Sequence, residues 1–228
     1  MTAGVTATIW PWVALAGLGA FHGVNPAMGW LFAVALGLQT GERGAVARAL
    51  PPIALGHAGS IAVVAIIVVL AQTAFDPLPL QLAAAAMLVG FGVYRLLRSH
   101  RHRFRAGMLA GAGDLVVWSF LMATAHGAGL MIVPVLLKLP LCTPPGLTPG
   151  PHAAVMAALA GSLWTGLLAV AVHTAAMLSV AGVIAWLVLR WLGLGVLRSS
   201  WINLDVLWST ALIGVGVVFL GLIGASVP

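Results

Sequence analysis

The sequence predicts an all-α integral membrane protein of six transmembrane helices, forming two inverted three-helix repeats with broken helices in spans 1 and 4. Of its 228 residues, 62% are hydrophobic and 6% are charged, against roughly 25% charged residues in soluble domains. The mean hydropathy is +1.13, and similar motifs recur in the same order in both halves. We therefore expect one transmembrane domain over residues 1–228, with repeat 1 at about 8–106 and repeat 2 at about 107–228.

The apolar runs give the spans, because a helix needs about 20 apolar residues to cross a bilayer. Six runs qualify: 8–39, 51–74, 79–97, 114–138, 153–190 and 203–226. The first and fifth are too long for one straight span, so we expect each to tilt, break or extend along the interface. The fifth is long enough to form two spans.

Basic residues decide between six and seven spans. With six spans, nine arginines fall in three connections on one side and only Lys138 points to the other; these are Arg43, Arg48, Arg95, Arg98, Arg101, Arg103, Arg105, Arg190 and Arg198. The positive-inside rule makes those connections cytoplasmic. We expect both termini outside, in a bacterial cytoplasmic (inner) membrane, and most tryptophans near span ends as interface anchors.

The first span contains the stretch FHGVNPAMGW. Pro26 interrupts a helix, and Asn25 is a good N-cap before a proline at the first helical position. A second half-helix is expected to begin at Asn25-Pro26, after a first half that ends near His22-Gly23. In span 4, His126-Gly127-Ala128-Gly129 offers a matching weak point. Paired breaks in two halves indicate a transporter binding site.

The two halves also match motif by motif. AFHGVNPAM in span 1 pairs with TAHGAGLM in span 4, and GHAGSIAVV in span 2 pairs with VHTAAMLSV in span 5. Spans 3 and 6 share a GxGV core. A duplicated unit of three spans must cross the membrane in opposite senses, as in many secondary transporters.

Four intramembrane histidines recur at equivalent places in the two repeats: His22, His57, His126 and His173. Intramembrane ionisable residues point to function, although each could instead bond a nearby backbone carbonyl. Imidazole suits Zn, Cu, Co and Ni, and thioether favours Cu(I). Three methionines follow histidines closely, namely Met28, Met131 and Met177, but methionine also fills apolar gaps. The candidate metal site comprises these seven side chains, and the substrate path adds Asn25, Pro26 and Ser60.

The motifs resemble those of a known group. GAFHGVNPAMG and ALGHAGSIAVV are similar to the first-span and second-span motifs of nickel/cobalt exporters and urease-accessory membrane proteins, within the lysine-exporter (LysE) superfamily. AMLVGFGVYRLLRSHRHRFR resembles their span 3 and its basic, histidine-bearing loop. The resemblance implies a duplicated three-span transporter, with His22 and Pro26 matching the first motif and His57 and Ser60 the second.

These observations predict a secondary transporter of a small solute, with a nickel/cobalt-like or copper-like cation as the leading substrate. The acidic residues Glu42, Asp76, Asp114 and Asp205 all fall in loops or near span ends. A divalent ion among neutral ligands would be poorly compensated, which favours a monovalent soft cation. An anion or zwitterion at the half-helix N-terminus is the alternative solute.

Other protein classes remain as alternatives. The sequence has no nucleophile, base and acid set, Walker loop or dinucleotide fingerprint, so no enzyme is predicted. Four intramembrane histidines would also suit a membrane haem or redox protein, or a subunit that assembles a metalloenzyme. Apart from a bound transition-metal ion, no cofactor is indicated. The expected partners are the lipid bilayer, the solute and further copies or subunits; nucleic acid is excluded, because the basic residues lie in short loops.

Overall fold

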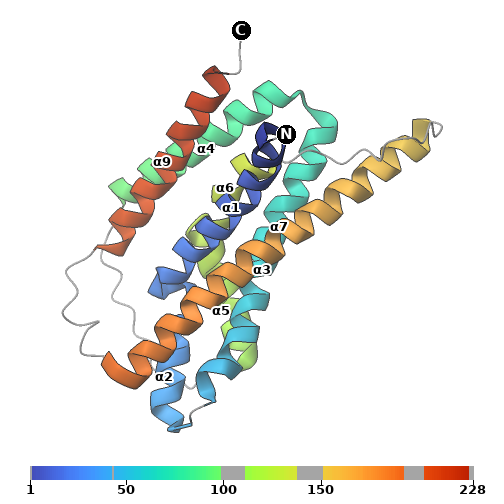
Figure 1. The fold of residues 1–228 in the computed structure, drawn as a ribbon. Helices are drawn as coiled ribbons and strands as arrows, with labels where there is room; N and C mark the ends of the chain where they lie inside the picture. Colours follow the sequence, from blue (N-terminus) through green and yellow to red (C-terminus); the bar gives the residue numbers. More distant parts are fainter. Residues whose placement is uncertain (1, 43, 99–110, 138–150, 193–202, 226–228) are drawn as a thin grey trace.

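The computed structural model describes residues 2–42, 44–98, 111–137, 151–192 and 203–225, and every regular element in them is helical (Figure 1). Four helices are long and apolar enough to cross a membrane, and a bent pair over Ala112–Leu136 makes a fifth candidate; the four are Ala45–Gln72, Pro77–Leu97, Leu163–Trp191 and Asp205–Gly224. The all-α class is therefore confirmed, with four or five candidate membrane spans in the described residues.

The helices alternate in direction through the bundle. In chain order the elements are α1 (Thr2–Val24), η1 (Pro26–Met28), α2 (Trp30–Thr40), α3 (Ala45–Ala74), α4 (Pro77–Leu97), α5 (Ala112–Ala125), α6 (Ala128–Leu136), α7 (Pro151–Leu187), η2 (Val188–Leu192) and α9 (Leu204–Gly224). In Figure 1, α1, α4 and α7 run downward, whereas α3, α5 and α9 run upward. The start of α1 and the end of α9 thus lie at the same end of the molecule.

The first apolar run breaks after Val24, but the second half-helix does not begin at Asn25-Pro26. The Asn25 side chain accepts a hydrogen bond from the amide of Ala27 at 3.0 Å and caps only the short 3-10 turn η1. Gly29 then has φ 117°, a left-handed conformation that glycine adopts without steric cost. That glycine ends the turn, so α2 starts at Trp30 and the predicted start was wrong.

The other run boundaries shift less. The fourth run breaks at the predicted place, because Gly127 has φ 70° and α5 and α6 meet at 62°. The fifth run is one continuous helix, α7, followed by the π-helical turn η2, so the choice of one span over two for this run agrees with the structure. The second run starts earlier than expected, at Ala45, with two prolines inside α3.

Glycines set the closest helix contacts. A Cβ on Gly19 or Gly23 of α1 would overlap backbone carbonyl oxygens of α7, and a Cβ on Gly56 of α3 would overlap a carbonyl of α5. Small residues of this kind let membrane helices approach closely. These contacts join α1 to α7 and α3 to α5, and because α3 also packs against α7, the four helices form the central bundle.

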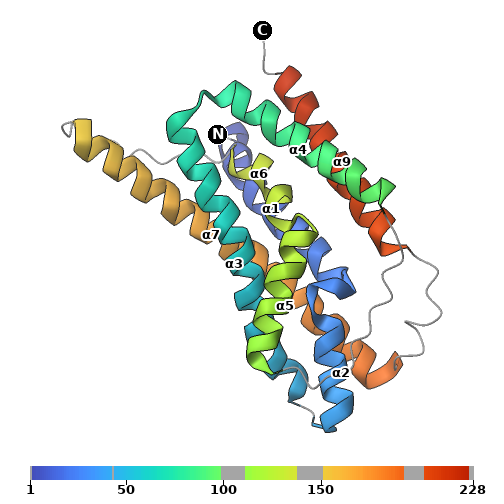
Figure 2. The ribbon, with the colours of Figure 1, turned by 180° about the vertical axis from the view of Figure 1, so that it is seen from behind.

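The helices α4 and α9 form a pair along one flank of the central bundle (Figure 1 and Figure 2). A Cβ on Gly92 would lie 2.7 Å from Ile213, and a Cβ on Gly216 would lie 2.8 Å from Val89. The contact is reciprocal, because a Cβ on Gly92 of α4 would meet α9 close to Gly216, and a Cβ on Gly216 would meet α4 close to Gly92. The GxGV cores of spans 3 and 6 thus pack on one another within the chain.

Candidate functional site

Three of the four predicted histidines meet in the central bundle. His22 near the end of α1, His57 in α3 and His173 in α7 are each 0% exposed. The ring centroids of His22 and His173 are 4.7 Å apart, and the His57 ring lies 5.7 Å from both of the others. We call these three side chains the histidine trio. Its members are separated by long stretches of sequence, so the fold assembles them.

Helix packing explains why the trio forms. Gly19 and Gly23 lie one turn apart on α1 and flank His22, so the close approach that they permit presses this part of α1 onto α7 at His173 and Met177. Gly56 gives α3 the same freedom against α5 immediately before His57. The sequence signal for this arrangement is the Gly-x-x-x-Gly pattern from Gly19 to Gly23, around His22.

Hydrogen bonding defines the tautomer of two rings. Nδ1 of His22 lies 2.7 Å from the carbonyl oxygen of Leu18, and Nδ1 of His173 lies 3.2 Å from that of Leu15. A carbonyl oxygen only accepts, so each neutral ring donates its proton from Nδ1 and keeps a lone pair on Nε2. This is the arrangement that metal-binding histidines use, with one nitrogen held by a backbone oxygen and the other available.

The available nitrogens have no partner. Nε2 of His22, Nε2 of His173 and both ring nitrogens of His57 are buried without a hydrogen bond. A buried polar group without a partner costs about 1–3 kcal/mol. Four such atoms in three neighbouring rings form an unsatisfied polar cluster in the central bundle, where the hydroxyl of Thr174 is also buried without a partner.

The fourth histidine joins the trio through a tryptophan. His126 ends α5, is 5% exposed, and donates from Nδ1 to the carbonyl of Met122, 2.9 Å away. The indole of Trp208 in α9 lies 4.5 Å from the His22 ring and 5.9 Å from the His126 ring, between centroids. Its Nε1 donates to the carbonyl of His126. Trp208 therefore bridges the trio and the break between α5 and α6.

Trp208 is the site residue that sequence reasoning missed. Tryptophans were expected as interface anchors, yet Trp208 is only 2% exposed, and Phe21 stacks on it with centroids 5.2 Å apart. Trp30 is also buried, and its Nε1 donates to the carbonyl of Val24 at 3.2 Å. Trp208 lies one turn inside α9, and its burial depends on the packing of that helix, which the sequence alone does not report.

The three candidate methionines are buried in apolar surroundings. Met131 belongs to a cluster with Leu88, Trp208 and Leu212, and Met177 belongs to a different cluster that includes Trp30 and Ile53. Met28 is likewise buried, inside η1. Packing accounts for the burial of Met131 and Met177, and the ligand role of all three methionines stays a prediction.

The residues of the predicted path are engaged in local structure. Asn25 caps η1, and Pro26 is the first residue of that turn. Ser60 Oγ lies 2.8 Å from Oγ1 of Thr124, whose hydroxyl donates to the carbonyl of Phe120. Ser60 therefore ties α3 to α5 just before the break at His126. Their contact with a passing solute stays a prediction.

Carboxylates lie away from the trio. Glu42 pairs with Arg48, and Asp114 accepts from the amide of Gly111. Asp205 pairs with Arg95 at 3.1 Å, and the same guanidinium donates to the carbonyl of Ala125 beside the α5 and α6 break. The trio is thus a cluster of neutral imidazole rings, whose unprotonated nitrogens can donate lone pairs to a metal ion.

The trio matches metal ligation in ring spacing and differs from it in nitrogen placement. With metal–nitrogen bonds of 2.0–2.1 Å, two imidazole centroids on one tetrahedral ion stand about 5 Å apart, close to the separations within the trio. In the described part of the chain, however, no group of three or more His, Cys, Asp or Glu side chains is arranged as a formed metal site. Ring rotation would have to accompany binding.

Comparison of this chain with family models, with curated proteins and with solved structures finds no match. The geometry of the trio and its surroundings is therefore the basis for a functional conclusion.

Proposed function

We propose that the chain is a secondary transporter of a transition-metal cation, which binds transiently to the histidine trio. The single observation that supports this most is the set of four buried ring nitrogens without hydrogen-bond partners in His22, His57 and His173. Three of these nitrogens can offer a lone pair, namely Nε2 of His22, Nε2 of His173 and one nitrogen of the neutral His57 ring, and a cation that accepts them would engage all three rings at once. Imidazole donors favour Zn, Cu, Co or Ni over Mg or Ca.

The absence of carboxylates from the trio suits transport rather than storage. Neutral ligands leave the charge of the ion uncompensated in a low-dielectric interior, so binding is weaker than in a charged site. Weak binding lets a transporter release its solute. A monovalent ion such as Cu(I) would cost least, and nickel-like or cobalt-like ions would need a transient anion or a lost proton.

Two alternatives receive less support. An anion at the helix break would need free amides, but the amides of Ala27, Met28 and Gly29 already donate within η1. A bis-histidine haem would need two imidazoles on opposite faces of a macrocycle. The rings of the trio instead contact one another directly, with no slot between them.

The proposal includes a six-span inverted repeat. Its support is the alternating helix direction in Figure 1, the reciprocal packing of Gly92 and Gly216, and the two broken segments. His22 and His126 each place Nδ1 against the carbonyl four residues earlier, directly before those breaks. In such transporters the two repeats rock around a central site, which here is the trio.

Metal binding and vesicle uptake test the role of the trio. We expect purified protein to bind Ni(II), Co(II) or Cu(I), measured by titration calorimetry, and vesicles to accumulate the same ion. Replacing His22, His57 or His173 by Gln should abolish both the metal binding and the accumulation of the ion in vesicles. The control is Ser179→Ala, also in α7, whose exposed hydroxyl bonds only the carbonyl of its own helix. Full transport by all three glutamine variants would refute the proposal.

Thiol labelling tests the orientation. Cys142 lies outside the described residues and is the only cysteine. Both termini outside and a cytoplasmic basic loop at 95–106 require the 141–152 connection to be external. A membrane-impermeant maleimide should therefore label Cys142 in intact cells. Labelling that needs permeabilised cells contradicts this orientation.

A further inference from the structure

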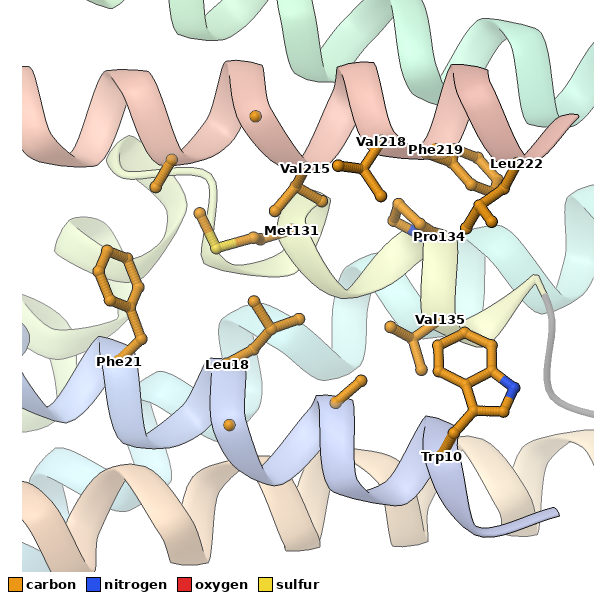
Figure 3. A pocket seen from close by; sticks show the side chains of 14 residues that line it. Trp10, Leu18, Phe21, Met131, Pro134, Val135, Val215, Val218, Phe219 and Leu222 are labelled. Carbon is orange, nitrogen blue, oxygen red and sulfur yellow. The ribbon is translucent and has the colours of Figure 1, made fainter. Parts of the chain in front are cut away.

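An apolar groove runs between α1 and α9, with α6 as its floor (Figure 3). Its volume is about 570 Å³, within the range of ligand pockets. All fourteen residues that line it are apolar or glycine. No histidine of the trio lines the groove. Phe21, which does line it, stacks on Trp208. The groove is thus a separate feature that reaches the edge of the candidate site.

The groove has a closed floor and an open rim. Pro134 and Val135 of α6, together with Phe219 of α9, are buried at the floor. Trp10 on α1 and Leu222 on α9 form part of the exposed rim. Figure 3 shows the side chains of both helices pointing into the space between them.

Two glycines keep the groove open from opposite walls. A Cβ added to Gly17 of α1 or to Gly214 of α9 would have no atom within 4 Å. These glycines therefore do not serve close helix packing, unlike Gly19 or Gly216. Larger side chains at the same positions would project into the groove and narrow it.

The surroundings identify the occupant. Water would find no hydrogen-bond partners on such a lining, and apolar cavities stay dry and take up apolar ligands. The rim residues belong to the exposed apolar surface that these membrane-spanning helices turn to the bilayer, so the groove is continuous with the lipid interface. An empty groove would forfeit packing contacts along both helices. Hydrocarbon chains are the one abundant apolar ligand at that surface.

We propose that this groove binds one acyl chain of a membrane phospholipid. The chain lies between α1 and α9 and fills the gap that separates the α4 and α9 pair from α1. It packs against Phe21 at one end, next to Trp208 of the site. This inference does not depend on metal transport and would hold for any activity of the protein.

Photolabelling in vesicles tests the proposal. The protein is reconstituted in phosphatidylcholine that contains a trace of phosphatidylcholine with a diazirine in one acyl chain, irradiated, and mapped by mass spectrometry. We expect label on the buried floor at Val135 and Phe219, besides the label on Ile67, which is 59% exposed on α3 and reports ordinary lipid contact. In Gly214→Leu the floor label should fall about tenfold, while the Ile67 label stays constant.

Matched variants complete the design. Gly17→Leu fills the groove from the other wall and should have the same effect. Gly90→Leu is the control, because Gly90 is equally open and exposed but lies outside the groove. Wild-type protein with label on Ile67 and none on the floor would overturn the proposal, as would floor label unchanged in both filling variants. A disulfide between two Gly214→Cys chains that removes the floor label would instead identify a second copy as the occupant.

Discussion

Replacing Gly19 by alanine should separate α1 from α7 and weaken the histidine trio. The new Cβ would lie 3.1 Å from the Cβ of Ala176 and would overlap the carbonyl oxygen of His173, so the helices must move apart. Overpacking of this kind costs about 1–3 kcal/mol. The movement also stretches the 3.2 Å hydrogen bond between His173 Nδ1 and Leu15, worth about 1 kcal/mol. Relative to an alanine substitution that causes no overlap, we expect a loss of about 2–4 kcal/mol.

Gly17→Ala is the matched control, two residues away on the same helix. Its Cβ meets no atom within 4 Å, and alanine in a helix is favoured over glycine by about 0.5–1 kcal/mol. Both variants are unfolded reversibly in detergent micelles with increasing SDS, and helix content is followed by far-UV circular dichroism. Equal stability of the two variants would refute the claim that Gly19 sets the distance between α1 and α7.

Three further predictions concern the surroundings of the trio. Trp208→Phe keeps a ring beside His22 but leaves the buried carbonyl of His126 unpaired, so the free energy of unfolding should fall by about 1–3 kcal/mol; an unchanged value would argue against the bridging role. Arg95→Gln should destabilise more than Asp205→Asn, because Arg95 also binds the Ala125 carbonyl, whereas the partly exposed ion pair alone is worth about 0–1 kcal/mol. Metal binding measured by calorimetry should weaken in acid, because protonated imidazole cannot coordinate; binding that stays constant down to the pH at which the fold is lost would argue against imidazole ligands.

The positions of breaks and histidines along the helices could be predicted from the sequence, but which helix faces lie against one another could not. The break at His126-Gly127 follows from glycine in an apolar run. The recurrence of histidines predicted that all four would form one site, whereas three of them meet directly. Which ones meet depends on which helix faces can touch, and this is decided by Gly19, Gly23 and Gly56. Trp208 escaped prediction because tryptophan is common at membrane interfaces, and its burial depends on how α9 packs. The delayed start of α2 depends on the backbone conformation of Gly29, which no hydrophobic pattern reports.

The bent segment formed by α5 and α6 bears on how the chain enters the membrane. The two helices have 14 and 9 residues, each shorter than the roughly 20 that a spanning helix needs. Neither can leave the insertion machinery as a complete span, and the carbonyls at their junction need protein partners. One stabilising neighbour, α3, is already synthesised and supplies Ser60, but Trp208 emerges much later. The carbonyl of His126 therefore gains its Trp208 donor only after α9 has been made, so the junction is completed by the last helix of the described chain.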